Sequence, residues 1–499
     1  MLYSRITVVP LALQLPAQTV SAASPLPGPP ADLRLSTPLT LLSALILLAG
    51  IGFVVWLHHA IPPLERLAAP ERALALLVGR TMDLERALTR LSPWERFFFE
   101  LSTGDSSREL EQSVDWYREL VEQSGSPASE LELAILLAEG GQRDEVTRLA
   151  DEWATRRDPY PNYAALLRAA YLGVTPDRDT VKLLEAEAAD ALPHGWFYDH
   201  VMLNLADSAG DKPLRSHIEA QSFGRQGALL RKGLQLATVE WMLVGVGMAA
   251  LAWIIRHRRD LDAVRVADAP VPPRWAAWPG AQVLIIGGAI EIVLTVVLLF
   301  GESRSLVLRL LAIPMATVPL VVLALRYLLG PWRLSPTQAF GLQPVERGWS
   351  NLFLLLPAVF AAISLGEWGL GHVAERLRLG NHWTEWFDPD LIYGGGAMFL
   401  VSLFEYVVLA PVVEEFTFRG LLFATLRRRV GLWPAALISS TIFAAAHGYG
   451  LVGFLSVLWS GVLWAWAYEK SGSLLPGILA HALNNLTVCT GLVMLLRSS

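Results

Sequence analysis

The chain has 499 residues, of which 53% are hydrophobic and 17% are charged. Soluble proteins carry about one quarter charged residues, so this composition excludes an ordinary soluble enzyme and a disordered chain. The single cysteine, Cys489, excludes a disulfide framework and a cysteine-based zinc site. A formal net charge of −6 without a basic stripe argues against binding to nucleic acid.

The charge is divided unevenly along the chain. Residues 61–230 hold 18 basic and 29 acidic residues, a net charge of −11, whereas the other 329 residues hold 22 basic and 17 acidic ones, a net of +5. The chain therefore combines a polar, acidic region with a hydrophobic one, and the hydrophobic region is most simply interpreted as embedded in a membrane.

The first part of the chain leads from a proline-rich segment into an acidic helical domain. Residues 1–36 are rich in proline, alanine and serine, which is typical of a disordered segment or a weak signal peptide. An apolar stretch at 38–57 has about the 20 residues that a bilayer-spanning helix needs. Amphipathic patterns then predict a helical hairpin at 129–157 and short helices at 163–172, 178–190 and 197–208. A tetratricopeptide-like stack and an irregular helical bundle both fit this pattern.

Apolar stretches resume after residue 233. They cover residues 236–255, 281–300, 306–329, 351–371, 393–427, 433–448, 451–468 and 475–495. With the first stretch they make about nine spans, so we expect an all-α polytopic membrane protein with an extramembrane helical domain. Arginine clusters directly follow 236–255 and 393–427, which predicts that these ends are cytoplasmic and that residues 61–230 are extracytoplasmic. We expect a multi-pass protein of a bacterial inner or plasma membrane.

These patterns divide the chain into five parts. They are the N-terminal segment 1–36, a first transmembrane helix 37–58, the acidic helical domain 59–233, a transmembrane region 234–345, and a C-terminal membrane core 346–499.

Polar residues inside the C-terminal spans are the strongest functional signal, because ionisable groups are costly in a bilayer. They occur as the motifs Glu414-Glu415-x-x-x-Arg419, Phe443-x-x-x-His447 and His481-x-x-x-Asn485. Residues four apart share a face of an α-helix, so Glu415 and Arg419 are expected to form an ion pair. Glu414 lies about 140° from Arg419 around the helix, which leaves its carboxylate available as a base.

The three motifs also lie at a similar depth. Glu414 is thirteen residues from Arg427, and His447 is thirteen residues beyond Pro434, which corresponds to roughly 20 Å along a helix in each case. His481 is eleven residues beyond Lys470, or roughly 16 Å. Glu414, His447 and His481 are therefore predicted to share one polar site inside the membrane.

In these three motifs the sequence resembles the CPBP intramembrane proteases over roughly residues 350–496. That family includes the type II CAAX prenyl endopeptidase and bacterial bacteriocin-processing and self-immunity (Abi) proteins. The stretches FRGLLFATLRRR and SGSLLPGILAHALNN also fit the family's usual context. The resemblance does not extend to the first 280 residues.

The resemblance implies an intramembrane endopeptidase. Glu414 would be the general base that activates water, and His447 would hold or polarise that water. His481 and Asn485 would stabilise the oxyanion, whereas Glu415, Arg419 and Phe443 would support the site. Burial suits a carboxylate for this role, because desolvation makes it a stronger base, and His and Asn supply the N–H donors that an oxyanion needs.

Several alternatives stay open. Zinc held by Glu414, His447 and His481 would give a metalloprotease, but the sequence has no HExxH motif, and we favour catalysis without a cofactor. A non-catalytic membrane scaffold with residues 61–230 as a binding module is a second alternative. A transporter is a third, although no inverted repeat supports it. The expected partners are the lipid bilayer, a membrane-protein or lipidated peptide substrate, and a protein partner at residues 61–230.

Overall fold

The structure is a computed structural model that describes residues 35–103, 108–300 and 306–497. Within these ranges every regular element is a helix and there is no strand, so the predicted all-α class is confirmed. The disordered or signal-like segment predicted at 1–36 falls almost wholly outside the described residues.

Eight helices in the described ranges are long and apolar enough to cross a bilayer, so the chain is an integral multi-pass membrane protein. They are α1 (Thr37–Ala60), α10 (Lys212–Arg256), α11 (Ala277–Phe300), the span Leu310–Trp332 that includes most of α12 (Leu306–Leu323), α14 (Gly348–Arg376), the span Gly396–Val430, α20 (Leu451–Ser471) and α21 (Leu475–Leu496). The ninth predicted span is α19 (Leu432–Ala446), whose 15 residues reach only about 22 Å, less than the hydrocarbon thickness.

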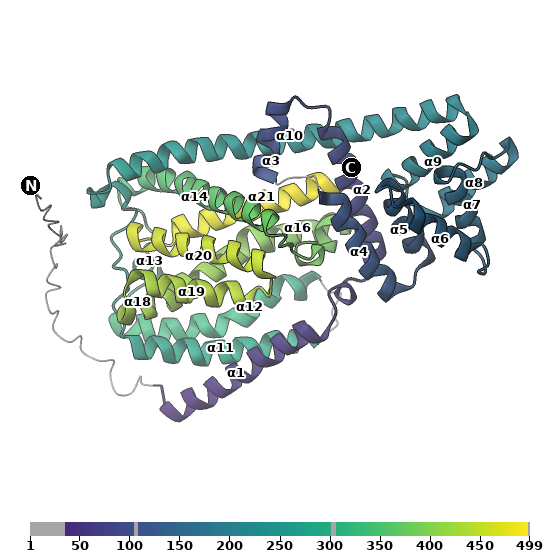
Figure 1. Ribbon diagram of the computed structural model, residues 1–499. Coiled ribbons are helices and arrows are strands. Elements are labelled where there is room, and N and C mark those ends of the chain that lie inside the picture. Colours follow the sequence, from purple (N-terminus) through teal and green to yellow (C-terminus); the bar gives the residue numbers. More distant parts are fainter. Residues whose placement is uncertain (1–34, 104–107, 301–305, 498–499) are drawn as a thin grey trace, which may run out of the picture.

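The acidic region forms a helical domain at one end of the membrane helices (Figure 1). Its helices are α2 (Pro70–Leu88), α3 (Pro93–Thr103), α4 (Glu109–Ser124), α5 (Pro127–Glu139), α6 (Arg143–Trp153), α7 (Tyr160–Tyr171), α8 (Arg178–Ala191) and α9 (Trp196–Ala209). The expected hairpin is formed by α5 and α6. Helix α6 buries Val146, Ala150 and Trp153 at helical spacing and turns its charged residues outward.

Helix α10 joins the outer domain to the membrane core as one continuous element of 45 residues, about 67 Å long. It runs without a break through residue 233, where the sequence placed a domain boundary. Its Arg225 contacts Asp83 of α2 at 2.6 Å and Asp199 of α9 at 2.5 Å. Both carboxylates are almost fully buried, so this cluster fixes the angle at which α10 leaves the outer domain.

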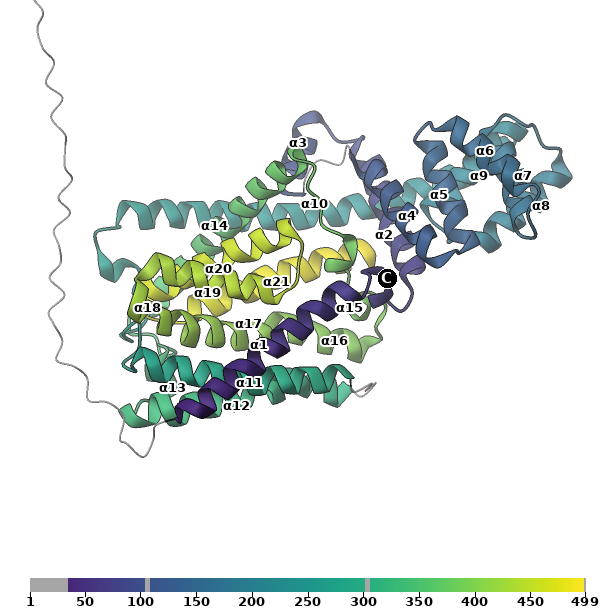
Figure 2. The same cartoon turned by 60° about the horizontal axis from the view of Figure 1, so that its bottom comes forward.

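The membrane core packs its helices closely (Figures 1 and 2). A Cβ atom on Gly247 of α10 would lie 2.1 Å from the backbone oxygen of Pro357 in α14, so only glycine allows these two helices to approach so closely. Helices α19 and α20 form a hairpin against α14 and α21. This hairpin carries one of the three polar motifs.

The loop before Gly396 connects the membrane core to the outer domain. Its His382 Nε2 lies 3.1 Å from Glu119 Oε2 of α4, and Arg72 of α2 lies 4.4 Å above the ring of Tyr393. Buried apolar residues of this loop and the end of α21 belong to the same hydrophobic cluster as the outer-domain core. The two parts therefore share one continuous interior.

The outer domain encloses an acidic side chain that links its stability to pH. Glu132 of α5 is 3% exposed, and burial raises the pKa of its carboxyl group to about 8. In the unfolded chain the group ionises near its ordinary pKa of 4.5. Between these values the folded chain holds a proton that the unfolded chain releases, so stability falls as pH rises, by about 1.4 kcal/mol per unit.

We predict that Glu132→Gln removes this dependence. The melting temperature of the outer domain in the full-length variant, followed by circular dichroism between pH 5 and pH 9, should exceed that of the wild type by a margin that grows towards pH 8. Glu122→Gln, a change on the exposed surface of α4, is the control and should follow the wild type. A constant difference between wild type and Glu132→Gln would contradict the prediction.

Candidate active site

The first polar motif lies on a long helix that contains two π-helical turns. The helix consists of α16 (Gly396–Phe404), a π turn (Glu405–Leu409), α17 (Ala410–Glu414), a second π turn (Glu415–Phe423) and α18 (Ala424–Val430). Pro411 accounts for the first π turn, because proline lacks an N–H group and its ring clashes with the carbonyl group four residues earlier. Such turns are frequent at functional sites.

Glu415 and Arg419 form a buried ion pair. Glu415 Oε1 lies 2.8 Å from Arg419 Nη1, and both side chains are fully buried. The guanidinium group also lies 4.3 Å from the ring centre of Phe443 and 5.0 Å from that of Trp464. Two aromatic faces therefore complement a positive charge that has no access to water.

The second π turn changes the angles that regular α geometry implies. Backbone hydrogen bonds in a π turn join residues five apart, so residues five apart come close to one face of the helix. Arg419 consequently interacts electrostatically with Glu414 as well as with Glu415. The separation of about 140° that we expected between Glu414 and Arg419 is wrong, because it assumed an uninterrupted α-helix.

His481 of α21 connects the two glutamates. Its Nδ1 lies 3.3 Å from Glu415 Oε1, and its Nε2 lies 3.7 Å from Glu414 Oε2. The ring stacks on Trp464 at a distance of 4.0 Å and an angle of 16°. The indole and the buried ion pair therefore fix the orientation of this imidazole.

The two adjacent glutamates have different surroundings. The side chain of Glu415 is fully buried, whereas that of Glu414 is 28% exposed. The 3.7 Å between Glu414 and His481 exceeds hydrogen-bond distance, so this contact leaves the carboxylate of Glu414 able to accept hydrogen bonds from another group.

His447 lies at the end of α19, next to Phe443. Its Nδ1 is 2.9 Å from the backbone oxygen of Phe443, to which a protonated Nδ1 donates. In the neutral ring Nε2 is then an acceptor. The ring of Phe443 lies 4.7 Å from that of His447 and 6.1 Å from that of His481, so it packs near both imidazoles.

Asn485 contacts a different part of the long helix. Its Nδ2 donates to the backbone oxygen of Tyr406 at 2.8 Å, within the first π turn. An amide carries two N–H bonds, so one remains for a further acceptor. The structure thus brings Glu414, Glu415, Arg419 and His481 into direct contact and places Phe443 and His447 beside them, whereas Asn485 contacts the π turn that precedes Glu414.

The three residues that the zinc alternative would need do not form a metal-binding cluster. Among the described residues, no three His, Cys, Asp or Glu side chains are grouped closely enough to hold a metal ion. Glu414, His447 and His481 all lie within the described ranges. In this arrangement they do not fit a three-ligand zinc site.

Several residues that support the site escaped sequence analysis. Glu385 accepts a hydrogen bond from the N–H of Gly450 at 3.1 Å, and Asn381 accepts one from Gly453 at 3.3 Å, so the loop before Gly396 holds the tip of the α19–α20 hairpin. Only the acidic character of that loop is visible in the sequence, and it does not indicate these partners.

Two glycines make room for the buried ion pair. A Cβ atom on Gly461 would lie 2.7 Å from Arg419 Nη2, and one on Gly477 would lie 2.8 Å from Glu415 Oε2. Such separations are too short for real side chains, so both positions accept glycine alone unless the charged groups move. The spacing of these glycines gives no sign of this role in the sequence.

We predict that Gly461→Ala destabilises the protein by about 1–3 kcal/mol, because the added methyl group overpacks the Arg419 site. The melting temperature of the purified protein should fall accordingly. Gly245→Ala in α10 is the matched control, since a Cβ atom there meets nothing within 4 Å. Equal melting temperatures for the two variants would contradict the prediction.

Comparison with known proteins places these motifs in a family. The family model described as type II CAAX prenyl endopeptidase Rce1-like matches residues 396–487, a range that contains all three motifs. The chain is also similar to an "Uncharacterized 24.3 kDa protein" of Escherichia coli, with 34% identity over 86 residues.

That alignment covers 16% of this chain and 40% of the relative, so the chain spans about two fifths of the length of the curated relative it matches. No solved structure matches the chain. The match of this family model to residues 396–487 confirms the resemblance drawn from the motifs.

Proposed function

We propose that the protein is an intramembrane endopeptidase that hydrolyses peptide bonds of membrane-associated substrates. The family is one of peptidases, which supports this activity at the level of reaction class. The observation that carries the proposal is the pairing of an accessible carboxylate, Glu414, with an imidazole, His481, that a fully buried Glu415–Arg419 pair holds in place.

In the proposed mechanism Glu414 is the general base. It takes a proton from a water molecule, and the resulting hydroxide attacks the carbonyl carbon of the substrate peptide bond. His447 accepts a hydrogen bond from the same water at Nε2, consistent with its Nδ1 contact to Phe443. The proton on Glu414 then passes to the leaving amine as the tetrahedral intermediate collapses.

The second N–H of Asn485 and the imidazolium form of His481 stabilise the oxyanion in this mechanism. The Nδ1–H of this imidazolium donates to Glu415, and its Nε2–H donates to the oxyanion. His481 is preorganised by Trp464, and the amide of Asn485 is oriented by the carbonyl group of Tyr406. Donors that are fixed before the reaction stabilise developing charge without a cost of reorganisation. Glu415, Arg419 and Phe443 position these groups.

We further propose that the substrate is a membrane protein or a lipidated peptide, because the site lies on helices that cross the bilayer. The arginine clusters favour an arrangement in which residues 61–230 are extracytoplasmic, in a bacterial inner or plasma membrane. In that arrangement the acidic domain is available to a protein partner.

We predict that Glu414→Gln and His447→Ala each reduce peptide cleavage by at least about 100-fold, since general acid–base catalysis contributes that much. Comparative proteomics of cells that carry wild type or Glu414→Gln should reveal an uncut membrane protein, which then serves as the substrate for the purified enzyme. Glu291→Gln in α11 is the matched control and should retain cleavage. Full activity of both site variants, at unchanged melting temperature, would favour the membrane scaffold instead.

We predict that the purified protein cleaves this substrate at an undiminished rate after treatment with a strong chelator, because the three candidate ligands form no metal-binding cluster. Elemental analysis should find less than one zinc ion per chain. A loss of cleavage that only added zinc restores would establish the metal-dependent alternative.

A further inference from the structure

Helix α3 of the outer domain exposes a group of aromatic side chains. Trp94, Phe97 and Phe98 are 66%, 58% and 47% exposed, and they are three and four residues apart or adjacent, so they lie on one face of the helix. The ring of Phe98 lies 6.4 Å from that of Trp94 and 5.5 Å from that of Phe97, so the three rings form one continuous patch. An exposed apolar patch of this kind marks a surface that another body covers.

The buried side of α3 is fixed on α10. A Cβ atom on Gly233 of α10 would lie 3.2 Å from the ring of Phe99, and the indole Nε1 of Trp241 donates to the backbone oxygen of Phe98 at 3.1 Å. Helix α3 therefore packs on α10 between residues 233 and 241. Figures 1 and 2 both show α3 beside α10, at the margin of the membrane helices.

The length of α10 shows where across the membrane this contact lies. The cluster of Arg256, Arg258 and Arg259 marks the membrane boundary at the end of α10. Trp241 is fifteen residues and Gly233 twenty-three residues before Arg256, or roughly 23 Å and 35 Å along the helix. Since the hydrocarbon layer is about 30 Å thick, α3 lies at its opposite boundary, where aromatic side chains gather in membrane proteins.

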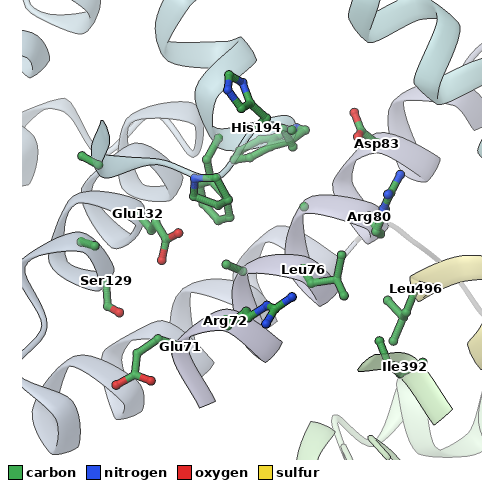
Figure 3. Close-up of a pocket in the computed structure, with 18 of the residues that line it drawn as sticks. Glu71, Arg72, Leu76, Arg80, Asp83, Ser129, Glu132, His194, Ile392 and Leu496 are labelled. Carbon is green, nitrogen blue, oxygen red and sulfur yellow. The ribbon is translucent and has the colours of Figure 1, made fainter. Parts of the chain in front are cut away.

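Helix α2 holds α3 in this position. Only residues 89–92 separate the end of α2 from α3. Figure 3 shows Leu76 of α2 opposite Ile392 of α15 (Pro389–Tyr393) and Leu496 of α21 across a cavity. The outer domain thus lies against the core at a second place, apart from the contact between α3 and α10.

The charged side chains of α3 have partners close to them in the chain. Arg96 Nε lies 2.6 Å from Glu100 Oε1, and Glu95 Oε2 accepts hydrogen bonds from the backbone N–H and the hydroxyl group of Ser92. Pairing lowers the cost of placing such groups beside a membrane. An amphipathic helix with Trp and Phe on one face and paired charges elsewhere is typical of helices that lie in the membrane interface.

We propose that the aromatic face of α3 inserts into the boundary of the bilayer that α10 crosses, and so anchors the outer domain on the lipid surface. Trp94, Phe97 and Phe98 are the anchoring side chains. Lipid is favoured over a protein partner as the covering body, because exposed apolar side chains of α10, Val239 and Met242, begin at the same distance from Arg256. The aromatic face is thus continuous in depth with the lipid-facing surface of the spans.

The experiment measures the depth of a nitroxide spin label in the full-length protein. Phe97→Cys is labelled and placed in nanodiscs of phosphatidylcholine and phosphatidylglycerol that hold one chain each, so a second copy cannot cover the label. Leu183→Cys in α8 is the matched control, because Leu183 is an apolar residue, 67% exposed, on the outer domain far from α10. The wild type, whose free Cys489 is buried, gives the background.

Oxygen concentrates in lipid, whereas a polar nickel chelate stays in water. The ratio of oxygen to nickel collisions at position 97 should exceed that at position 183 by about tenfold, because an apolar environment excludes the chelate. Trp94→Cys places a second label on the same face and should behave like Phe97→Cys. All variants are compared at unchanged melting temperature. Equal ratios at positions 97 and 183 would show that the face lies in water, and few collisions with either reagent at position 97 would show that protein covers it; either result would overturn the proposal.

Discussion

The candidate site depends on one buried ion pair, Glu415 with Arg419. Both side chains are fully buried, so each charge has lost its hydration and needs the other. Removing one partner from such a pair costs about 3–5 kcal/mol, because the remaining charge stays buried alone. The residues that surround the pair meet this requirement. Phe443 and Trp464 place their faces against the cation, and Gly461 leaves the space that the guanidinium group fills.

The Glu415–Arg419 pair also fixes the position of His481, which faces the proposed base Glu414. His481 contacts the carboxylate of Glu415 on one side and faces Glu414 on the other. Glu415 is fully buried and paired with Arg419, so it positions the imidazole without competing for the substrate. The two consecutive glutamates thus differ in surroundings, one closed within the protein and one partly exposed, although they are the same residue type.

Sequence patterns were sufficient to predict the helical class, most spans, the short helices of the outer domain and the Glu415–Arg419 contact. Each of these depends on local periodicity or on spacing within one helix. The π turns were not predictable in this way, because the periodic pattern of apolar residues does not show where the backbone adds a residue. Pro411 is the one local signal for the first of them.

Contacts between distant segments were also beyond sequence analysis. His382 meets Glu119 across 263 residues, and Glu385 meets Gly450 across 65, and neither pair has a spacing that a helix or a motif would indicate. The first of these contacts depends on how the outer domain packs on the core, and the second on how the loop before Gly396 packs on the α19–α20 hairpin.

The loop before Gly396 contacts both the outer domain and the α19–α20 hairpin. Through His382 the loop contacts the outer domain, and through Glu385 it holds the hairpin tip that follows His447. The end of α21, the helix that carries His481, lies in the same hydrophobic cluster as the outer-domain core. The outer domain is therefore connected to two elements of the candidate site by packed contacts, to α21 directly and to the α19–α20 hairpin through this loop.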